Sequence, residues 1–306
     1  MINITQEEVK RVKAQGFLFN RNQDFFSARV ITKNGVVNAQ QMQAITQAAE
    51  KFGNGHMAFT SRLTVEIQGV PYENIQPLQD FLAQYGLKTG GTGAKVRPVV
   101  ACKGTVCVYG KIDTQGIAKE IHERFFEGYS KVALPHKFKI AVGGCPNNCV
   151  KPDLNDFGIV GQCVPNFQEE ICRGCKKCAI ETLCPAKAAK LENGKMHINS
   201  ETCFHCGRCV GKCPFKAIED GTIGYKVYIG GRWGKFTRHG TPINKIFTNK
   251  EEVLDLLEKT ILYYKENGQK GERLATMVDR IGIEEVERAL LGDALLRRKE
   301  EILSKE

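Results

Sequence analysis

Residues 134–150 read LPHKFKIAVGGCPNNCV, and this stretch decides the fold that we expect for the chain. Read as a β-strand, it alternates between two faces, with Lys137 and Lys139 on one and Phe138 and Ile140 on the other. One face is therefore cationic and the other is apolar.

A cysteine loop follows this strand directly. Gly143 and Gly144 would let the backbone pass close to a bulky group, and Cys145-Pro-Asn-Asn-Cys149 comes next. Paired lysines that lead into a cysteine loop indicate an anion held beside a metal centre. The alternative is a solvent-facing edge strand, protected by its lysines, before a turn with incidental cysteines. The metal-ligand spacing of the other cysteines favours the metal centre.

The cysteine content points the same way. Thirteen cysteines occur among 306 residues, a length that can form two or three domains and bury a sizeable core without disulfides. The first residues, MINITQEEVKRV, lack the apolar core of a secretory signal, so we expect a cytoplasmic protein whose clustered cysteines bind metal. No apolar run approaches the roughly 18 residues that span a bilayer.

The formal net charge of +10 does not indicate nucleic-acid binding, because Lys and Arg are spread along the chain without a long basic run. Thiolate-bound metal clusters carry negative charge that the formal count omits. Basic residues near such clusters would compensate this charge.

Helical and strand patterns alternate up to residue 150. Thr5-Gln-Glu-Glu8 has the form of a capping box and opens a helix that ends near Gly16. A second helix is expected over residues 39–52, and one strand over residues 59–70, with Arg62 on its polar face. The glycine run at 90–93 lacks the spacing of a dinucleotide motif, so no nicotinamide or flavin site is predicted.

Residues 163–220 differ from the rest, since they contain nine of the thirteen cysteines among prolines, glycines and lysines. This segment is too poor in apolar residues to fold around a core of its own, so we expect metal to stabilise it. A strand and glycine-loop pattern resumes at residue 224, and residues 249–298 are mostly helical in pattern. The cysteine-rich segment is therefore expected as an insertion within a larger α/β domain.

Eight of these nine cysteines form two runs, C-x2-C-x2-C-x5-C-P and C-x2-C-x2-C-x3-C-P. Both resemble the bacterial two-cluster ferredoxin pattern, in which the last cysteine of each run binds the cluster of the other run. The first run has two extra residues before its last cysteine, which lengthens a loop but keeps the ligand count. The resemblance implies two [4Fe-4S] clusters, one held by Cys172, Cys175, Cys178 and Cys213 and the other by Cys203, Cys206, Cys209 and Cys184. Zinc is the alternative, but its C-x2-C pairs usually stand alone.

Five cysteines remain outside these runs. Cys102 and Cys107 form one pair and Cys145 and Cys149 form another, and each pair follows an expected strand, which suits a third [4Fe-4S] cluster. Cys163 has no partner in this scheme and is expected to be a small buried residue.

The two pairs resemble the cysteine motifs of the siroheme-containing sulfite and nitrite reductases. In that family four thiolates hold a cluster, and the last of them also bridges to the siroheme iron. The resemblance implies that Cys149 is this shared ligand and that Asn147 and Asn148 beside it contact siroheme. The family's first motif commonly has five residues between its cysteines, whereas Cys102 and Cys107 are separated by four.

Four cations extend the resemblance. TSRLTVEIQG at 60–69 is similar to the family's first anion-binding strand, an arginine stands where a second is expected, and LPHKFK resembles its paired-lysine strand. The resemblance implies that Arg62, Arg97, Lys137 and Lys139 bind the substrate oxyanion and assist its protonation. Reduction of sulfite or nitrite calls for such residues, because cations stabilise the negative charge as oxygens leave. Each alone is also compatible with an ordinary surface cation.

A glycine-rich segment, GGRWGKFTR at 230–238, resembles the family's segment that lies along siroheme. The resemblance implies that Gly231, Arg232, Lys235 and Arg238 meet the carboxylates of siroheme through backbone amides and basic side chains. The same pattern of glycines and basic residues would also be expected for a plain hairpin with exposed basic side chains.

We therefore expect an α+β protein with a sulfite-reductase-type mixed α/β core and an inserted, small ferredoxin-like domain. The expected units are a ferredoxin-like part at 1–70, a siroheme and cluster core at 71–162, the two-cluster insert at 163–221, and the returning core with C-terminal helices at 222–306. Within the family, this combination without a flavin part is similar to the catalytic C subunit of anaerobic sulfite reductases, or to a related clostridial-type enzyme.

The resemblance implies a sulfite reductase that carries out the six-electron reduction of sulfite to sulfide. Electrons from a ferredoxin or a flavin-containing partner would pass through the two ferredoxin-type clusters to the third cluster and siroheme. A nitrite reductase built from the same parts and a non-catalytic electron carrier are the alternatives. Large family members contain the core twice, whereas this chain has no internal repeat, so we expect two chains to pair and share their sites.

Overall fold

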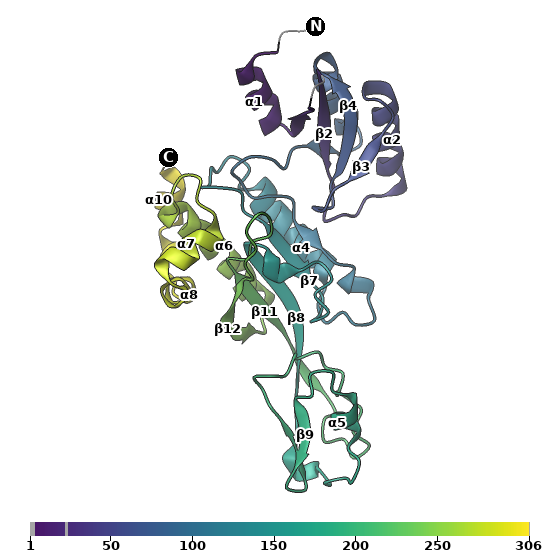
Figure 1. Ribbon diagram of the computed structural model, residues 1–306, viewed down its shortest axis with the longest axis vertical. Coiled ribbons are helices and arrows are strands. Elements are labelled where there is room, and N and C mark those ends of the chain that lie inside the picture. Colours follow the sequence, from purple (N-terminus) through teal and green to yellow (C-terminus); the bar gives the residue numbers. More distant parts are fainter. Residues whose placement is uncertain (1–3, 22–23, 306) are drawn as a thin grey trace.

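The computed structural model describes residues 4–21 and 24–305. Three units follow one another along its long axis, as Figure 1 shows: an N-terminal domain, a central core with the C-terminal helices beside it, and a small insert at the far end. Helices and strands are mixed in the first two units.

The N-terminal domain is a five-stranded sheet with helices packed against it. Its strand order is β1-β2-β4-β3, and β5 pairs with β2. The elements are α1 (Gln6–Ala14), β1 (Phe17–Phe19), β2 (Phe25–Ile31), α2 (Ala39–Phe52), β3 (Met57–Phe59), β4 (Val65–Pro71), the 3-10 turn Tyr72–Asn74, α3 (Ile75–Ala83) and β5 (Lys88–Thr89). The capping box at Thr5 and the helix over residues 39–52 are confirmed.

This domain continues beyond residue 70. Leu78 and Leu82 of α3 are buried in the same hydrophobic cluster as Ile45 of α2 and Ile67 of β4. The structure therefore places the boundary near residue 89. The expected division at 70 fell too early because a strand pattern does not reveal that the next helix packs back onto the same sheet.

The single strand expected over 59–70 is wrong. β3 and β4 pair antiparallel, with Phe59 opposite Val65, and the chain turns between them. Leu63 in the turn is left-handed, with φ of 57°, and its amide donates to the Thr60 carbonyl at 3.0 Å. Apolar alternation continues through the turn, which is why the sequence reads as one strand. Arg62 consequently lies in this turn and not on a strand face.

The core sheet has five strands in the order β12-β11-β8-β7-β6. The strands β6 to β8 are parallel, and the other two are antiparallel to their neighbours. The strands are β6 (Val100–Ala101), β7 (Ile140–Gly143), β8 (Phe157–Pro165), β11 (Gly221–Ile229) and β12 (Thr241–Phe247).

Helices cover this sheet. Helix α4 (Thr114–Ile121), continued by the π-helical segment His122–Glu127, contacts β6 and β7, and α6 (Lys250–Asn267) contacts β11 and β12. The remaining helices pack around α6: α7 (Leu274–Ile281), α8 (Ile283–Leu291), α9 (Ala294–Arg297) and α10 (Lys299–Ser304). Within the described part of the chain, none of the helices has the length and apolar character needed to cross a bilayer.

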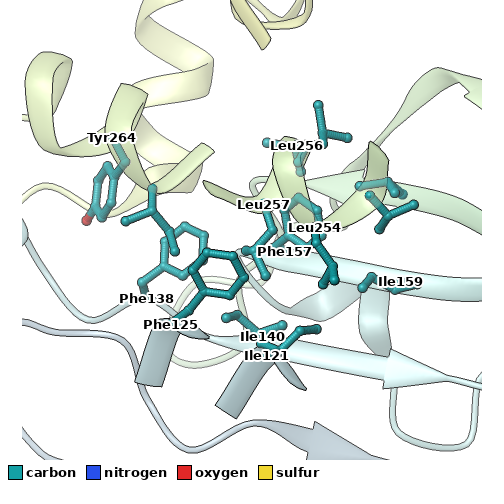
Figure 2. Packing of buried hydrophobic residues seen from close by; sticks show 14 of the residues in the cluster. Ile121, Phe125, Phe138, Ile140, Phe157, Ile159, Leu254, Leu256, Leu257 and Tyr264 are labelled. Atoms are coloured by element: carbon teal, nitrogen blue, oxygen red, sulfur yellow. The ribbon is translucent and has the colours of Figure 1, made fainter. Parts of the chain in front are cut away.

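The sheet and its helices share one hydrophobic core. Figure 2 shows side chains of α4, the sheet and α6 meeting there, among them Ile121, Ile140, Phe157 and Leu257, which are all fully buried. Each such burial contributes roughly 1.5–3 kcal/mol. Phe138, Ile140 and Val142 are buried as expected, but β7 covers only Ile140–Gly143 and Ala141 is buried too, so the strand has no cationic face and the two lysines lie just before it.

The cysteine-rich segment leaves the core sheet at the end of β8 and returns at the start of β11. These strands pair antiparallel along their whole length, with Pro165 opposite Gly221. The insert contains the 3-10 turn Glu169–Ile171, α5 (Ala179–Leu183) and the hairpin of β9 (Ala189–Glu192) and β10 (Lys195–Ile198). It has a small buried core of Ile180, Ala189, Met196 and Ile218, although its composition predicted none.

Candidate functional site

The amino-terminal end of β7 carries a cluster of cations, which we call the cation end. Lys137 and Lys139 precede the strand directly. The segment of Arg97 lies beside them, because Val96 forms a parallel bridge with Phe138, and the Arg97 amide donates to the Phe138 carbonyl at 2.8 Å.

Arg62 reaches the cation end from the β3–β4 turn and fastens the N-terminal domain to the core. Its guanidinium donates to the carbonyls of Pro98 and Ile140 and, at 2.7 Å, to Oδ1 of Asn155. These bonds occupy four of its five N–H groups. Burial and then the nearby Arg97 lower the pKa of Arg62 to about 10, with Asp156 opposing them. Arg62 therefore acts first as a structural link between the N-terminal domain and the core.

Arg97 is held by the glycine loop that joins the two domains. Its Nη1 donates to the Gly91 carbonyl at 2.7 Å, whereas its buried Nε has no partner in the described parts of the chain. Burial and then Arg29 and Arg273 lower the pKa of Arg97 to about 10. Arg97 thus has a free donor in a strongly positive surrounding.

The two lysines are held by their backbones and leave their ammonium groups free. The amide of Lys137 donates to Nδ1 of His136 at 2.7 Å, and that of Lys139 donates to Oδ2 of Asp156 at 2.8 Å. Within residues 4–21 and 24–305, neither ammonium group has a hydrogen-bond or ion-pair partner. Burial and then Arg62 lower the pKa of Lys139 to about 8, and burial followed by Arg273 and Arg97 lowers that of Lys137. Lys139 is therefore suited to donate a proton near neutral pH.

A buried ion pair that the sequence did not predict supports the lysine strand. Asp156, which is fully buried, accepts two hydrogen bonds from Nη2 of Arg273, at 3.0 and 2.9 Å. Burial raises the pKa of Asp156, and Arg273 opposes this rise. The two residues are 117 positions apart in sequence, so no local sequence pattern predicts the pair. Asp156 positions Lys139 through its backbone, and Arg273 adds positive charge to the cation end.

The carboxyl-terminal end of the same strand carries the core cysteines, and we call it the thiol end. Because β6 and β7 are parallel, the loops that follow them leave at the same edge of the sheet. The loops touch through glycines, since a Cβ on Gly144 would lie 2.8 Å from Cα of Gly104. The Gly144 amide donates to Sγ of Cys102 at 3.2 Å. Only glycines permit this approach of the two cysteine loops.

The four core thiols lie close enough to influence one another. Burial raises the pKa of the Cys145 thiol, and Cys149, Cys102 and Cys107 raise it further. In the described residues, no group of three or more Cys, His, Asp or Glu side chains is arranged to hold a metal ion. A [4Fe-4S] cluster binds each thiolate through a separate iron, so it needs wider spacing than one ion does. Four thiols on two apposed loops, with Cys149 exposed, fit such a cluster with an outward-facing ligand.

The asparagines next to Cys149 differ in their surroundings. Asn147 is exposed, whereas Asn148 is left-handed, with φ of 56°, and donates to Oδ1 of Asp153 at 2.8 Å. The buried Oδ1 of Asn148 has no partner among the described residues. The structure thus leaves one unsatisfied acceptor beside Cys149.

The glycine-rich segment after β11 is a hairpin, closed by an antiparallel bridge between Arg232 and Arg238. Gly231 passes so close to the backbone that a Cβ would lie 2.3 Å from the Asp153 carbonyl. Arg238 points to the protein, with Nε 2.8 Å from Oδ1 of Asp279, whereas Lys235 is exposed. The expected basic residues therefore separate into Arg238, which supports the hairpin, and Arg232 and Lys235, which remain available.

In the insert, one small cavity is lined by Cys184, Cys203, Cys206 and Cys209. Burial raises the pKa of Cys209 to about 11, and the other three thiols raise it as well. These four are one of the two ligand sets that the ferredoxin resemblance implies. Of the other set, Cys172, Cys178 and Cys213 pack against the core of the insert. Cys163 is 5% exposed, which confirms the expectation of a small buried residue.

The structure does not bring the cation end and the thiol end together. They are separated by the four residues of β7, a distance of about 13 Å at ~3.3 Å per residue. Each end faces its own edge of the sheet.

Comparisons with known proteins fit this architecture. A family model described as "Nitrite and sulphite reductase 4Fe-4S domain" matches residues 92–297, and one described as "Nitrite/Sulfite reductase ferredoxin-like half domain" matches residues 20–85. A coenzyme F420-dependent sulfite reductase of Methanocaldococcus jannaschii is 32% identical over 251 residues, which cover 81% of this chain but only 39% of that protein. The C subunit of the anaerobic sulfite reductase of Salmonella typhimurium is 28% identical, over 78% of this chain and 74% of its own length.

The fold agrees as well. The crystal structure of a dissimilatory sulfite reductase superposes with a TM-score of 0.71 at 20% identity, covering 88% of this chain and 70% of that one. The expected α+β sulfite reductase fold is thereby confirmed.

Proposed function

Since the chain belongs to the nitrite and sulfite reductase family, we propose that it is a siroheme-dependent sulfite reductase. Membership implies siroheme and a [4Fe-4S] cluster as cofactors. The observation that carries the proposal is the pair of lysine ammonium groups without partners in the described residues, beside Arg97 and the buried Arg273. Two unpartnered ammonium groups in this positive surrounding favour a bound anion, and sulfite is small enough to be surrounded by them.

The chain's own residues bind the anion and supply protons. Lys137, Lys139 and the free donor of Arg97 hold the sulfite oxygens, and the remaining N–H of Arg62 adds to their field. Each departing oxygen needs two protons and two electrons to leave as water; Lys139 gives one of the protons, solvent supplies the other and re-protonates the lysine, and the lowered pKa of Lys139 favours the transfer. Siroheme, coupled to its cluster, supplies the six electrons when bound. Nitrite reduction on the same parts is the second candidate, because nitrite needs the same cations.

Three sets of four cysteines would hold the clusters through which electrons pass. Cys102, Cys107, Cys145 and Cys149 would hold the core cluster, with Cys149 as the ligand next to siroheme, and the two sets of the insert would hold the clusters that supply it with electrons. The shared cavity of Cys184, Cys203, Cys206 and Cys209 supports the crossed arrangement in the insert. Electrons enter at the insert, from a ferredoxin or a flavin-containing partner.

The site is completed by a second chain. The separation of the two ends of β7 supports an assembly in which the cation end of one chain serves the siroheme held by Cys149 of another. The partner is a second copy or a related chain.

The substrate is tested by steady-state assays of the anaerobically purified protein, loaded with siroheme, under reduced methyl viologen. We expect a higher kcat/KM for sulfite than for nitrite, and the reverse order would assign a nitrite reductase. If the visible spectrum shows no siroheme bands after co-expression with siroheme synthesis, the result would indicate that the chain is an electron carrier and not an enzyme.

Complementation tests the shared site. A Cys149→Ser chain and a Lys137→Ala, Lys139→Ala chain are each expected to be inactive alone. Co-expressed, they are expected to recover part of the activity, because one of the two sites in a mixed dimer has both intact ends. No recovery in isolated mixed dimers would mean that each chain contains its own complete site.

A further inference from the structure

We propose that a second ligand site lies between the N-terminal domain and the core, and that it binds a small organic anion with a flat apolar body. The site is a cavity of about 620 Å³, within the range of ~300–1,000 Å³ that is usual for small-molecule sites. The N-terminal domain contributes Ile31 and Lys33, the connecting loop contributes residues 88–92, and the core contributes His122 and Phe126. None of the cysteines or cations of the proposed reductase site lines it.

The lining charge is positive. Lys33, Lys88 and Lys95 line the cavity against one acid, Glu127. Lys88 pairs with this glutamate at 3.3 Å, and Lys33 pairs with Glu123 outside the cavity at 3.8 Å. Both pairs are largely exposed, and such pairs contribute only ~0–1 kcal/mol. Lys95 donates to the Ser130 carbonyl at 2.5 Å. An entering anion therefore displaces the two ion pairs at little cost and meets Lys33 and Lys88, with Lys95 held beside them.

His122 supplies the observation that most directly points to a ligand. The residue is only 2% exposed, it lines the cavity, and its Nδ1 has no hydrogen-bond partner in the described residues. A buried polar atom left unpaired costs ~1–3 kcal/mol, so folded proteins rarely keep one without a bound group. Burial lowers the pKa of His122, which leaves a neutral ring that can accept or donate one hydrogen bond.

The wall around His122 is suited to a flat group. Its ring centroid lies 4.8 Å from that of Phe126, and Ile31 and Val96 add apolar surface. His122 also begins the π-helical segment His122–Glu127, and π-helical turns occur frequently at functional sites. An apolar body would rest on this wall while its charged group meets the lysines at the mouth.

The cavity is linked to the cation end through one carbonyl. Gly91 lines the cavity, and its carbonyl accepts from Nη1 of Arg97 at 2.7 Å and from Nη1 of Arg29 at 3.3 Å. A ligand that orders the Gly90–Thr92 loop therefore also fixes Arg97. Occupancy of the second site is expected to change the affinity for the substrate, and this consequence rests on the proposed function. Binding of the organic anion to the second site does not rest on it.

The test is calorimetric titration of the anaerobic holoprotein with phenyl phosphate, inorganic phosphate and benzyl alcohol. Phenyl phosphate is expected to bind saturably and at least tenfold more tightly than inorganic phosphate, because it presents both parts that the site recognises, and benzyl alcohol is expected not to bind. A Lys88→Ala, Lys95→Ala variant is expected to lose at least tenfold in affinity. Lys10→Ala, at an exposed position of α1, is the matched control and should bind as the wild type does.

A Lys139→Met variant separates this site from the reductase site. It is expected to bind phenyl phosphate like the wild type, even if the protein does not reduce sulfite. Hydrogen exchange should slow over residues 88–97 and 122–130 on binding. Absence of saturable binding, unchanged affinity in the double lysine variant, or loss of binding in Lys139→Met would each overturn the proposal.

Discussion

The two ends of β7 are built in different ways. The cation end is assembled from segments far apart in sequence: Arg62 from the first domain, Arg97 from the connecting segment and Arg273 from the C-terminal helices. The thiol end is assembled from two loops that follow neighbouring parallel strands and touch through Gly104 and Gly144. Long-range ion pairs and hydrogen bonds hold the first, whereas backbone contact holds the second.

This difference predicts different kinds of failure. A glycine contact between backbones cannot relax by moving a side chain, so damage at the thiol end should remove the cofactor. The lysines at the cation end directly precede β7, and their ammonium groups have no partner among the described residues, so their loss should lower activity and leave the cofactors in place.

The largest effect is expected from Gly144→Ala. The new Cβ would lie 2.8 Å from the backbone of Gly104 and 3.3 Å from Cγ2 of Thr114, so the cysteine loops must separate. We expect loss of the core cluster, a fall in iron content of about one third if three clusters are present, and no measurable turnover. Iron analysis and the visible spectrum measure this. Gly234→Ala is the control, because no atom lies within 4 Å of its Cβ, and equal iron in both variants would contradict the prediction.

Lys139→Met is expected to lower kcat/KM for sulfite by roughly 10²–10³ without changing iron or siroheme content, because one cation that stabilises the departing oxygen is lost. Steady-state kinetics under reduced methyl viologen measure this. Lys119→Met, at an exposed position of α4, should keep full activity. Loss of siroheme in Lys139→Met would mean that the cation end also holds the cofactor.

The pH profile gives a smaller effect. Lys139 is active when protonated and its pKa is lowered to about 8, so kcat/KM is expected to fall as the pH rises through 8, by about tenfold at pH 9. In Lys139→Arg this alkaline limb should disappear, since arginine stays protonated in this range. An unchanged limb in that variant would assign the titration to another group.

The smallest effect is expected at the glycine-rich hairpin. Arg238→Gln removes the bond to Asp279, which is 59% exposed, and should lower the free energy of unfolding by about 1 kcal/mol with little loss of siroheme. Arg232→Gln should leave stability unchanged but weaken siroheme retention. Thermal unfolding and siroheme content, measured on both variants, distinguish support of the hairpin from contact with the cofactor.

Sequence reasoning succeeded where a local pattern decides burial, since alternation identified Phe138, Ile140 and Val142 as buried, although β7 is buried on both faces. Cysteine spacing and the family resemblance together predicted the twelve proposed ligands. It failed where contacts are distant: Arg273, and His122 with its Nδ1 unpartnered among the described residues, acquire their roles only when the chain has folded. It also failed at Arg62, since apolar alternation runs on through the β3–β4 turn and conceals it. The contacts of loop glycines and the long-range pairs are therefore the features that could be identified only from the structure.

The antiparallel pairing of β8 and β11 has an evolutionary consequence. Pro165 and Gly221 stand opposite each other, so the chain enters and leaves the insert at one point of a continuous ribbon. A short turn in place of residues 166–220 would close the ribbon as an ordinary hairpin without altering its register. The cysteine-rich insert is therefore portable: a lineage can gain or lose it in a single genetic event and keep the rest of the fold intact.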